Sequence, residues 1–119
     1  MPAYKESISQ IHLLRWFRLQ YPDLADLLVG YPAGNNMNLL TAVRMKAMGL
    51  RVGMPDLQLL VPRFNPKFIP GLFIEMKSER GRLSKSQNDF HDKLRNQNYT
   101  IVTSYSFDEA KYEIQEYLK

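Results

Sequence analysis

Two apolar segments separated by a proline-containing stretch constrain the fold of this 119-residue chain more than any other feature. Residues Asp56–Val61 and Gly71–Lys77 have the length and composition of β-strands. Between them lie Pro62, Pro66 and Pro70, which cannot donate to a strand ladder and therefore favour a loop. We predict that the two strands pair antiparallel around this loop, with position 56 opposite positions 75 to 77.

The rest of the sequence predicts further helices and strands around this pair. We expect helices over about Glu6–Gln20, Leu39–Met48, Ser84–Asn96 and from Ser106 to near the end, and strands over Leu27–Tyr31 and Tyr99–Thr103. Gly49 is expected to be a left-handed helix cap, and Ser106 with Glu109 has the spacing of a capping box. The order α-β-α-β-β-α-β-α favours an α/β fold, with a central mixed β-sheet flanked by helices. No repeat or linker divides the sequence, so residues 1–119 are expected to form a single domain.

The amino-acid composition restricts the chemistry that the chain can perform. It has no cysteine, which excludes disulfides, thiolate metal sites and cysteine nucleophiles. Its histidines are His12 and His91, so a zinc site would depend heavily on carboxylates. Oxygen-ligated Mg²⁺, with Mn²⁺ as a substitute, suits this inventory better.

Charge and hydropathy indicate the kind of partner. The net charge of +4 and the pI near 9.4 are compatible with a polyanion such as DNA. The apolar stretches are too short to cross a bilayer, and the first residues do not resemble a secretion signal. We therefore expect a cytoplasmic protein with no membrane partner.

Charged residues at the ends of the two central strands form the candidate site. Side chains alternate along a strand, so Glu75 and Lys77 should project to one side while Ile74 and Met76 point to the other. A register that places Asp56 on the Glu75 face would bring two carboxylates and one ammonium together. Such carboxylates suit Mg²⁺, the Met76 carbonyl could add a ligand, and Lys77 could orient a water or stabilise negative charge.

These segments resemble the PD-(D/E)XK nuclease superfamily, and more closely its virus-type replication-repair nuclease (VRR-NUC) branch. That branch has an early helix with Glu and Gln, a Gly-x-Pro-Asp-Leu strand, a Gly-Leu-x-Ile-Glu-x-Lys strand and a helix opening with Ser-x-x-Gln. The corresponding residues here are Glu6 and Gln10, Gly53–Leu57, Gly71–Lys77 and Ser84–Gln87. The resemblance extends over nearly the whole chain.

The resemblance implies a restriction-endonuclease-like fold and a metal-dependent DNA endonuclease. It implies Asp56 and Glu75 as metal ligands, Lys77 as the catalytic lysine, Gln87 as a supporting active-site residue and Glu6 as a further acidic residue of the site. It also implies products with a 5′-phosphate. Stand-alone members of this size resemble phage-type enzymes that act as homodimers on branched DNA, including four-way (Holliday) junctions, which implies a bacterial or phage-infected cell.

Simpler interpretations of the same residues stay open. Glu75 and Lys77 could form an ordinary ion pair on an edge strand, Asp56 could belong to a turn, and Gln87 could only cap its helix. Glu6 could be a surface residue, and His12 and His91 are expected to be surface or core-edge residues rather than ligands. Arg80, Arg82 and Lys85 could contact DNA phosphates beside the site or form a solvated basic loop.

The leading functional hypothesis is a nuclease that attacks DNA with a metal-activated water. The alternative is a non-catalytic DNA-binding module that retains the nuclease fold. A third hypothesis, a small structural or interaction protein, would leave the clustered charges of Asp56, Glu75 and Lys77 unexplained.

Overall fold

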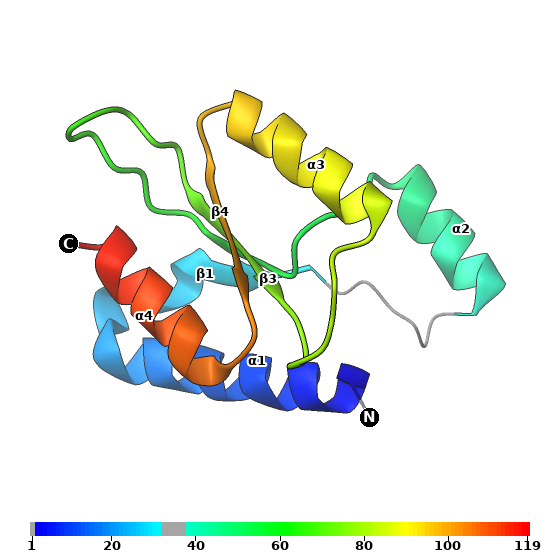
Figure 1. Cartoon of the computed structure of the whole chain (residues 1–119), viewed down its shortest axis with the longest axis horizontal. Coiled ribbons are helices and arrows are strands. Elements are labelled where there is room, and N and C mark those ends of the chain that lie inside the picture. The colour runs from blue at the N-terminus through cyan, green and yellow to red at the C-terminus, as the bar shows by residue number, and fades with distance from the viewer. Residues whose placement is uncertain (1, 32–37) are drawn as a thin grey trace.

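A computed structural model describes the backbone of residues 2–31 and 38–119, and the side chains of residues 7–31 and 38–119. In chain order its elements are α1 (Pro2–Gln20), the 3-10 helix η1 (Pro22–Leu27), β1 (Leu28–Gly30), α2 (Leu39–Ala47), β2 (Leu57–Leu59), β3 (Leu72–Met76), α3 (Lys85–Asn96), β4 (Thr100–Ser104) and α4 (Phe107–Tyr117). Figure 1 shows a β-sheet with helices on both sides. The predicted α/β fold with a central mixed sheet is confirmed.

The described strands form one sheet in the order β1-β2-β3-β4. β2 pairs antiparallel with β1 on one side and with β3 on the other, and the β2–β3 pair is the one predicted for the two segments around the prolines. β4 runs parallel to β3. The parallel pair follows from the connection between them, because α3 crosses over from the end of β3 to the start of β4. In the β2–β3 register Leu57 lies opposite Ile74. Asp56, one residue earlier, therefore lies opposite Glu75.

Helices cover both faces of β3, which is buried along its whole length. α1 and α4 lie on one side of the sheet and α3 lies on the other (Figure 1). Leu72, Ile74 and Met76 point into the main core, whose other buried members are Leu13, Phe17, Leu28, Leu57, Leu59, Ala110 and Ile114. Because side chains alternate along a strand, Glu75 points to the opposite face, where α3 lies.

The starts of α3 and α4 follow the capping signals in the sequence. At α3 the Ser84 side chain accepts from the Gln87 backbone N–H, and the Gln87 side chain accepts from the Ser84 N–H, which makes a complete capping box. At α4 only half of the predicted box forms, since Ser106 accepts from the Glu109 N–H but the Glu109 carboxylate accepts from the Tyr105 N–H instead. The predicted cap at the end of α2 is also confirmed, because Gly49 has a positive φ of 118°.

The observed strands are shorter than the predicted ones. β1 starts at Leu28 because η1 includes Leu27. β2 ends at Leu59, and the chain beyond it runs outward to the prolines with an isolated bridge between Arg63 and Ile69. At the outer end the Val61 carbonyl accepts from the Tyr117 hydroxyl of α4 instead of from a strand. These changes at the strand ends leave the β2–β3 register as predicted.

Helix α2 contributes nothing to the core. It is described in full and none of its residues is buried, and in Figure 1 it lies to one side of the sheet near the start of α3. Leu39 and Leu40 are 81% and 72% exposed. The sequence predicted the helix correctly, but not its separation from the sheet.

The loop before β2 packs against the start of α3 at Gly53. A Cβ atom at Gly53 would lie 2.3 Å from the backbone oxygen of Ser86 and 3.0 Å from the backbone nitrogen of Gln87, and the φ of Gly53 is 89°. Glycine therefore allows the loop that leads into Asp56 to approach the helix that carries Gln87.

We expect Gly53→Ala to destabilise the fold by roughly 2–4 kcal/mol, because a left-handed φ costs about 1–2 kcal/mol and displacing a packed neighbour adds about 1–3 kcal/mol. Gly49→Ala is the matched control, since its φ is also positive but no atom lies within 4 Å of its added Cβ. That variant should lose only the backbone component. Denaturant unfolding of both variants measures the difference, and equal losses would contradict the proposed contact with α3.

Candidate active site

Asp56 and Glu75 meet where β2 and β3 lie side by side. The Oδ2 atom of Asp56 accepts a 2.7 Å hydrogen bond from the backbone N–H of Met76, the residue after Glu75. This bond holds the Asp56 carboxylate against the segment that carries Glu75 and Lys77. Its other oxygen, Oδ1, accepts no hydrogen bond from any residue within the described ranges. The structure thus brings the first two predicted site residues together.

Glu75 is a carboxylate inside the protein, with only 2% of its surface exposed. Burying a charged carboxylate costs on the order of several kcal/mol unless hydrogen-bond donors or cations compensate. Two side chains of α3 reach it. Gln87 Nε2 donates to Oε2 at 3.3 Å, and His91 Nε2 lies 3.1 Å from Oε1. This arrangement is not the exposed ion pair of an edge strand, which was the simpler interpretation of Glu75.

Gln87 has both of the roles that the sequence allowed. Its Oε1 atom accepts from the Ser84 N–H at 2.9 Å as part of the capping box, which leaves Nε2 to donate to Glu75. One amide therefore joins the start of α3 to the buried carboxylate. Because the cap holds the oxygen end of the amide, the nitrogen end is oriented toward Glu75.

His91 was not among the predicted site residues, and the expectation of a surface or core-edge position is wrong. It is completely buried against Glu75. Burial, followed by the positive charge of Arg95, lowers the pKa of His91, and the smaller effect of Lys77 acts in the same direction. A sequence signal existed, since His91 lies four residues after Gln87 and so on the same face of α3. His12, by contrast, is exposed as expected.

Lys77 directly follows β3 at the edge of the same cluster. Its backbone N–H donates to the Ser104 carbonyl of β4 at 2.9 Å, and its side chain is half-buried. A Cβ at Gly81 would lie 3.3 Å from Lys77 Cδ, so the side chain runs beside the turn that follows β3. The charges of Lys77 and Asp56 have small, opposite effects on the pKa of His91, which Lys77 lowers and Asp56 raises.

Helix α1 approaches this cluster from the other face of the sheet. Gln10 Nε2 would lie 3.4 Å from a Cβ at Gly30, and the Asp56 carbonyl would lie 3.8 Å from the same atom. Glu6 is on α1, one turn before Gln10. The predicted ligand role of Glu6 falls outside the described residues, because only the backbone is described at that position.

The donor atoms fit a hard divalent cation. Asp56 and Glu75 supply carboxylate oxygens, and the Met76 carbonyl lies in the same stretch of chain. Among the residues with described side chains, no group of three or more histidines and carboxylates gathers as a metal cage. Mg²⁺ keeps several waters and binds through one or two carboxylates, so the carboxylates of Asp56 and Glu75 are donors of the kind that it takes.

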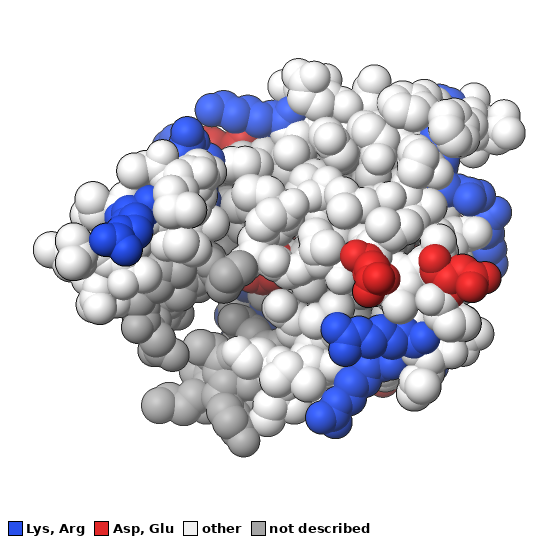
Figure 2. Space-filling view, turned by 180° about the vertical axis from the view of Figure 1, so that it is seen from behind, with Lys and Arg blue, Asp and Glu red and all other residues white. Residues whose placement is uncertain are grey.

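The predicted DNA-contact residues lie beside this cluster. Arg80 and Arg82 are exposed on the connection from β3 to α3, and Lys85 is exposed in the first turn of α3, where it pairs with Asp89 at 2.8 Å. Figure 2 shows that, on the face opposite to the Figure 1 view, the lysines and arginines of the described residues lie in several separate groups, one of them in the lower middle beside acidic residues.

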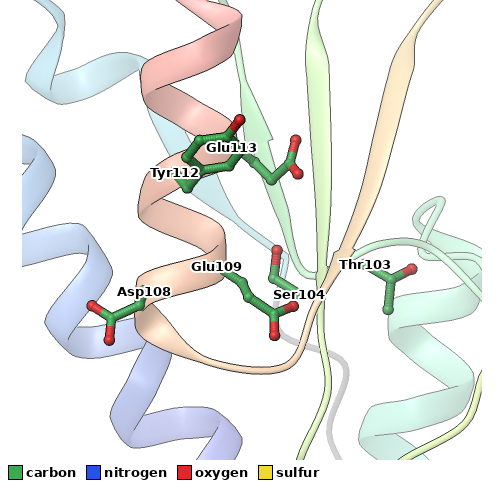
Figure 3. A pocket seen from close by; sticks show the side chains of 6 residues that line it. All are labelled: Thr103, Ser104, Asp108, Glu109, Tyr112 and Glu113. Atoms are coloured by element: carbon green, nitrogen blue, oxygen red, sulfur yellow. The ribbon is translucent and has the colours of Figure 1, made fainter.

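An acidic hollow lies next to the edge strand β4. It is lined by Thr103, Ser104, Asp108, Glu109, Tyr112 and Glu113. Figure 3 shows its carboxylates on α4, on the opposite side of β4 from the Thr103 side chain. Such a cluster repels phosphate groups. A nucleic acid that reaches Asp56 and Glu75 is therefore expected to approach from the α3 side of β4.

Comparison with known proteins identifies the family. The sequence profile of the VRR-NUC domain matches residues 4–108. The chain is a member of the VRR-NUC family. The match includes the segments with Asp56, Glu75, Lys77 and Gln87. Among curated proteins, none matches this sequence.

A solved structure supports the same fold. It is described as a VRR_NUC domain protein, and its similarity covers 96% of this chain and 88% of that chain, with a TM-score of 0.80 and 24% sequence identity. At this identity the likeness shows the fold alone, which is of the PD-(D/E)XK type. Membership in the VRR-NUC family places the chain among nucleases and indicates a DNA-binding surface. In the described part of this VRR-NUC domain, no helix has the length and apolar character needed to cross a bilayer.

Proposed function

We propose that this VRR-NUC domain is a metal-dependent endonuclease that hydrolyses phosphodiester bonds in DNA. The observation that carries the proposal is the contact between the Asp56 carboxylate and the Met76 N–H, which fixes one carboxylate opposite the buried carboxylate of Glu75. Two acidic residues on adjacent strands, one of them buried, with a half-buried lysine two residues further along β3's direction, are costly for stability and typical of a catalytic site.

Asp56, Glu75 and the Met76 carbonyl are the residues that would hold Mg²⁺ or Mn²⁺, and Glu6 on α1 is the further candidate. The bound cation supplies charge stabilisation for the phosphoryl group and lowers the pKa of a bound water. Lys77, half-buried at the end of β3, would orient the attacking water or stabilise the negative charge that develops on the phosphate. Gln87 holds Glu75 in place and would act as the supporting residue of the site.

The substrate class rests on the resemblance to phage-type members of the family. We infer cleavage of branched DNA such as four-way (Holliday) junctions, products with a 5′-phosphate, and a homodimer that presents two sites to two strands. A cytoplasmic enzyme of a bacterial or phage-infected cell, acting in DNA repair, is consistent with this substrate.

Cleavage assays on four-way, flap and linear DNA with Mg²⁺ or Mn²⁺ test the proposed function. Asp56→Asn, Glu75→Gln and Lys77→Met remove the charges while preserving much of the side-chain shape. We expect each to lower kcat by about 100-fold or more, the order of magnitude lost with a group that stabilises transition-state charge. Asp26→Asn and Lys93→Met are matched controls, since both residues are exposed and away from the cluster, and they should cut like the wild type.

The same assay separates the alternatives. A wild type that binds junctions without cutting them would favour the non-catalytic binding module. Cleavage that survives both Asp56→Asn and Glu75→Gln would contradict the assigned site. A folded protein that neither binds nor cuts DNA would leave the structural hypothesis as the explanation.

The proposed DNA path crosses the connection between β3 and α3. Arg80 and Arg82 are exposed three and five residues after Lys77, and Lys85 follows on the first turn of α3. Lys85 already pairs with Asp89, so the two arginines are the stronger candidates for phosphate contacts.

Arg80→Gln with Arg82→Gln should therefore weaken junction binding and reduce its salt dependence. Each lost phosphate contact removes about 0.9 from the slope of log K against log salt concentration, so the double variant should lose a slope of about 2. Fluorescence anisotropy over a salt series measures this in the Glu75→Gln background, where the DNA stays intact. Arg15→Gln with Arg18→Gln on α1 is the matched control, because both side chains are exposed there. An equal loss of slope in the two pairs would contradict the proposed path.

A further inference from the structure

Helix α3 packs on the sheet through a histidine. All residues of α3 are described, and His91 is the only buried one, with 0% exposure. Its apolar neighbours Phe90 and Leu94 are only half-buried. A leucine at position 91 would bury more apolar surface and leave no unpaired Nδ1, but it would remove the polar contact to the Glu75 carboxylate. Packing alone therefore does not explain a histidine at this position.

The Glu75 contact bears on which imidazole nitrogen carries the proton. In the proposed site Glu75 is an ionised metal ligand, and an ionised carboxylate only accepts hydrogen bonds, so His91 Nε2, at 3.1 Å from Oε1, would be the donor. In a neutral imidazole the other nitrogen, Nδ1, is then a bare acceptor. Nδ1 is buried and has no hydrogen-bond partner among the described residues.

The unpaired Nδ1 atom of His91 lowers the stability of the fold, while the Nε2 atom gives the Glu75 carboxylate a partner. A buried polar atom without a partner costs about 1–3 kcal/mol. The chain keeps this cost while placing a donor on a carboxylate that faces Asp56 across the strand register. Local arrangements that conflict with stability are expected at functional sites.

Gln87 and His91 together hold the Glu75 carboxylate from both ends. They lie on successive turns of α3 and contact different oxygens: Gln87 Nε2 donates to Oε2, and His91 Nε2 lies 3.1 Å from Oε1. Two donors on one rigid helix fix both the position and the plane of the carboxylate.

We propose that His91 is a positioning residue for Glu75, and that its Nε2–H orients the carboxylate for cation binding. The inference rests on the proposed function, in which Glu75 is a metal ligand. His91 itself contacts Glu75 rather than the DNA, so it acts through that carboxylate. Partners of metal-ligating side chains typically contribute about 10–100-fold to metal affinity or activity.

Three substitutions at position 91 distinguish the effect of a hydrogen-bond donor from the effect of the imidazole ring. In His91→Gln the amide nitrogen is the same number of bonds from Cα as His91 Nε2, so it can reach Glu75. In His91→Asn the amide is one bond shorter and matches Nδ1 instead, and His91→Leu has no donor. Leu94→Ala is the stability control, because it loosens α3 without removing any contact to Glu75.

The measurements are Mn²⁺ affinity by calorimetry and the rate of junction cleavage, both below the melting temperature of each variant. We expect His91→Gln to stay within about threefold of the wild type, and His91→Asn and His91→Leu to lose about 10–100-fold in both quantities. Leu94→Ala should match the wild type. A fully active His91→Leu, or a His91→Gln as impaired as His91→Asn, would overturn the proposal.

A nuclear magnetic resonance measurement on the metal-free protein decides the case where the variants do not fold. Long-range ¹⁵N–¹H spectra report the tautomer of His91, which should be protonated at Nε2 and should change its ring shifts in Glu75→Gln. An Nδ1-protonated ring, or shifts indifferent to Glu75→Gln, would overturn the proposal. A wild type that neither binds Mn²⁺ nor cuts DNA would defeat the proposed function instead, and the tautomer would still show whether His91 holds Glu75.

Discussion

The structure depends above all on the burial of one carboxylate in the central strand of the sheet. Glu75 lies on β3 with helices over both faces, and only 2% of it is exposed. Donors must therefore surround it, and α3 supplies them through Gln87 and His91. The close approach of the Gly53 loop to α3 brings the segment before Asp56 to the same place. The capping box, the glycine loop and the buried histidine thus serve the position of a single side chain.

Much of this arrangement could be predicted because it is set by local rules. The prolines between the two apolar segments favoured a loop and an antiparallel pair, and the pairing placed Asp56 opposite Glu75 as expected. The Ser84 capping box fixed the start of α3 and so the face on which Gln87 lies. Periodicity, turn residues and caps act over a few positions of the chain, and a single sequence contains that information.

The contribution of His91 was missed although its position carried a signal. His91 lies four residues after Gln87 and three before Leu94, and so on the same face of α3, but a lone histidine there gives no local sign that it contacts a buried carboxylate. The separation of α2 from the sheet was equally hidden, because its apolar residues have the pattern of a packed helix although none is buried. Both outcomes depend on how distant elements meet, which is decided by tertiary packing rather than by local pattern.

The central claim is that Asp56 and Glu75 together bind a divalent cation at the end of the β2–β3 pair. The most direct measurement is anomalous X-ray diffraction from crystals of the protein containing Mn²⁺. We expect an anomalous peak coordinated by carboxylate oxygens of both residues, with the Asp56 carboxylate still next to the Met76 amide. No peak there at saturating Mn²⁺, or a peak bound elsewhere on the chain, would contradict it.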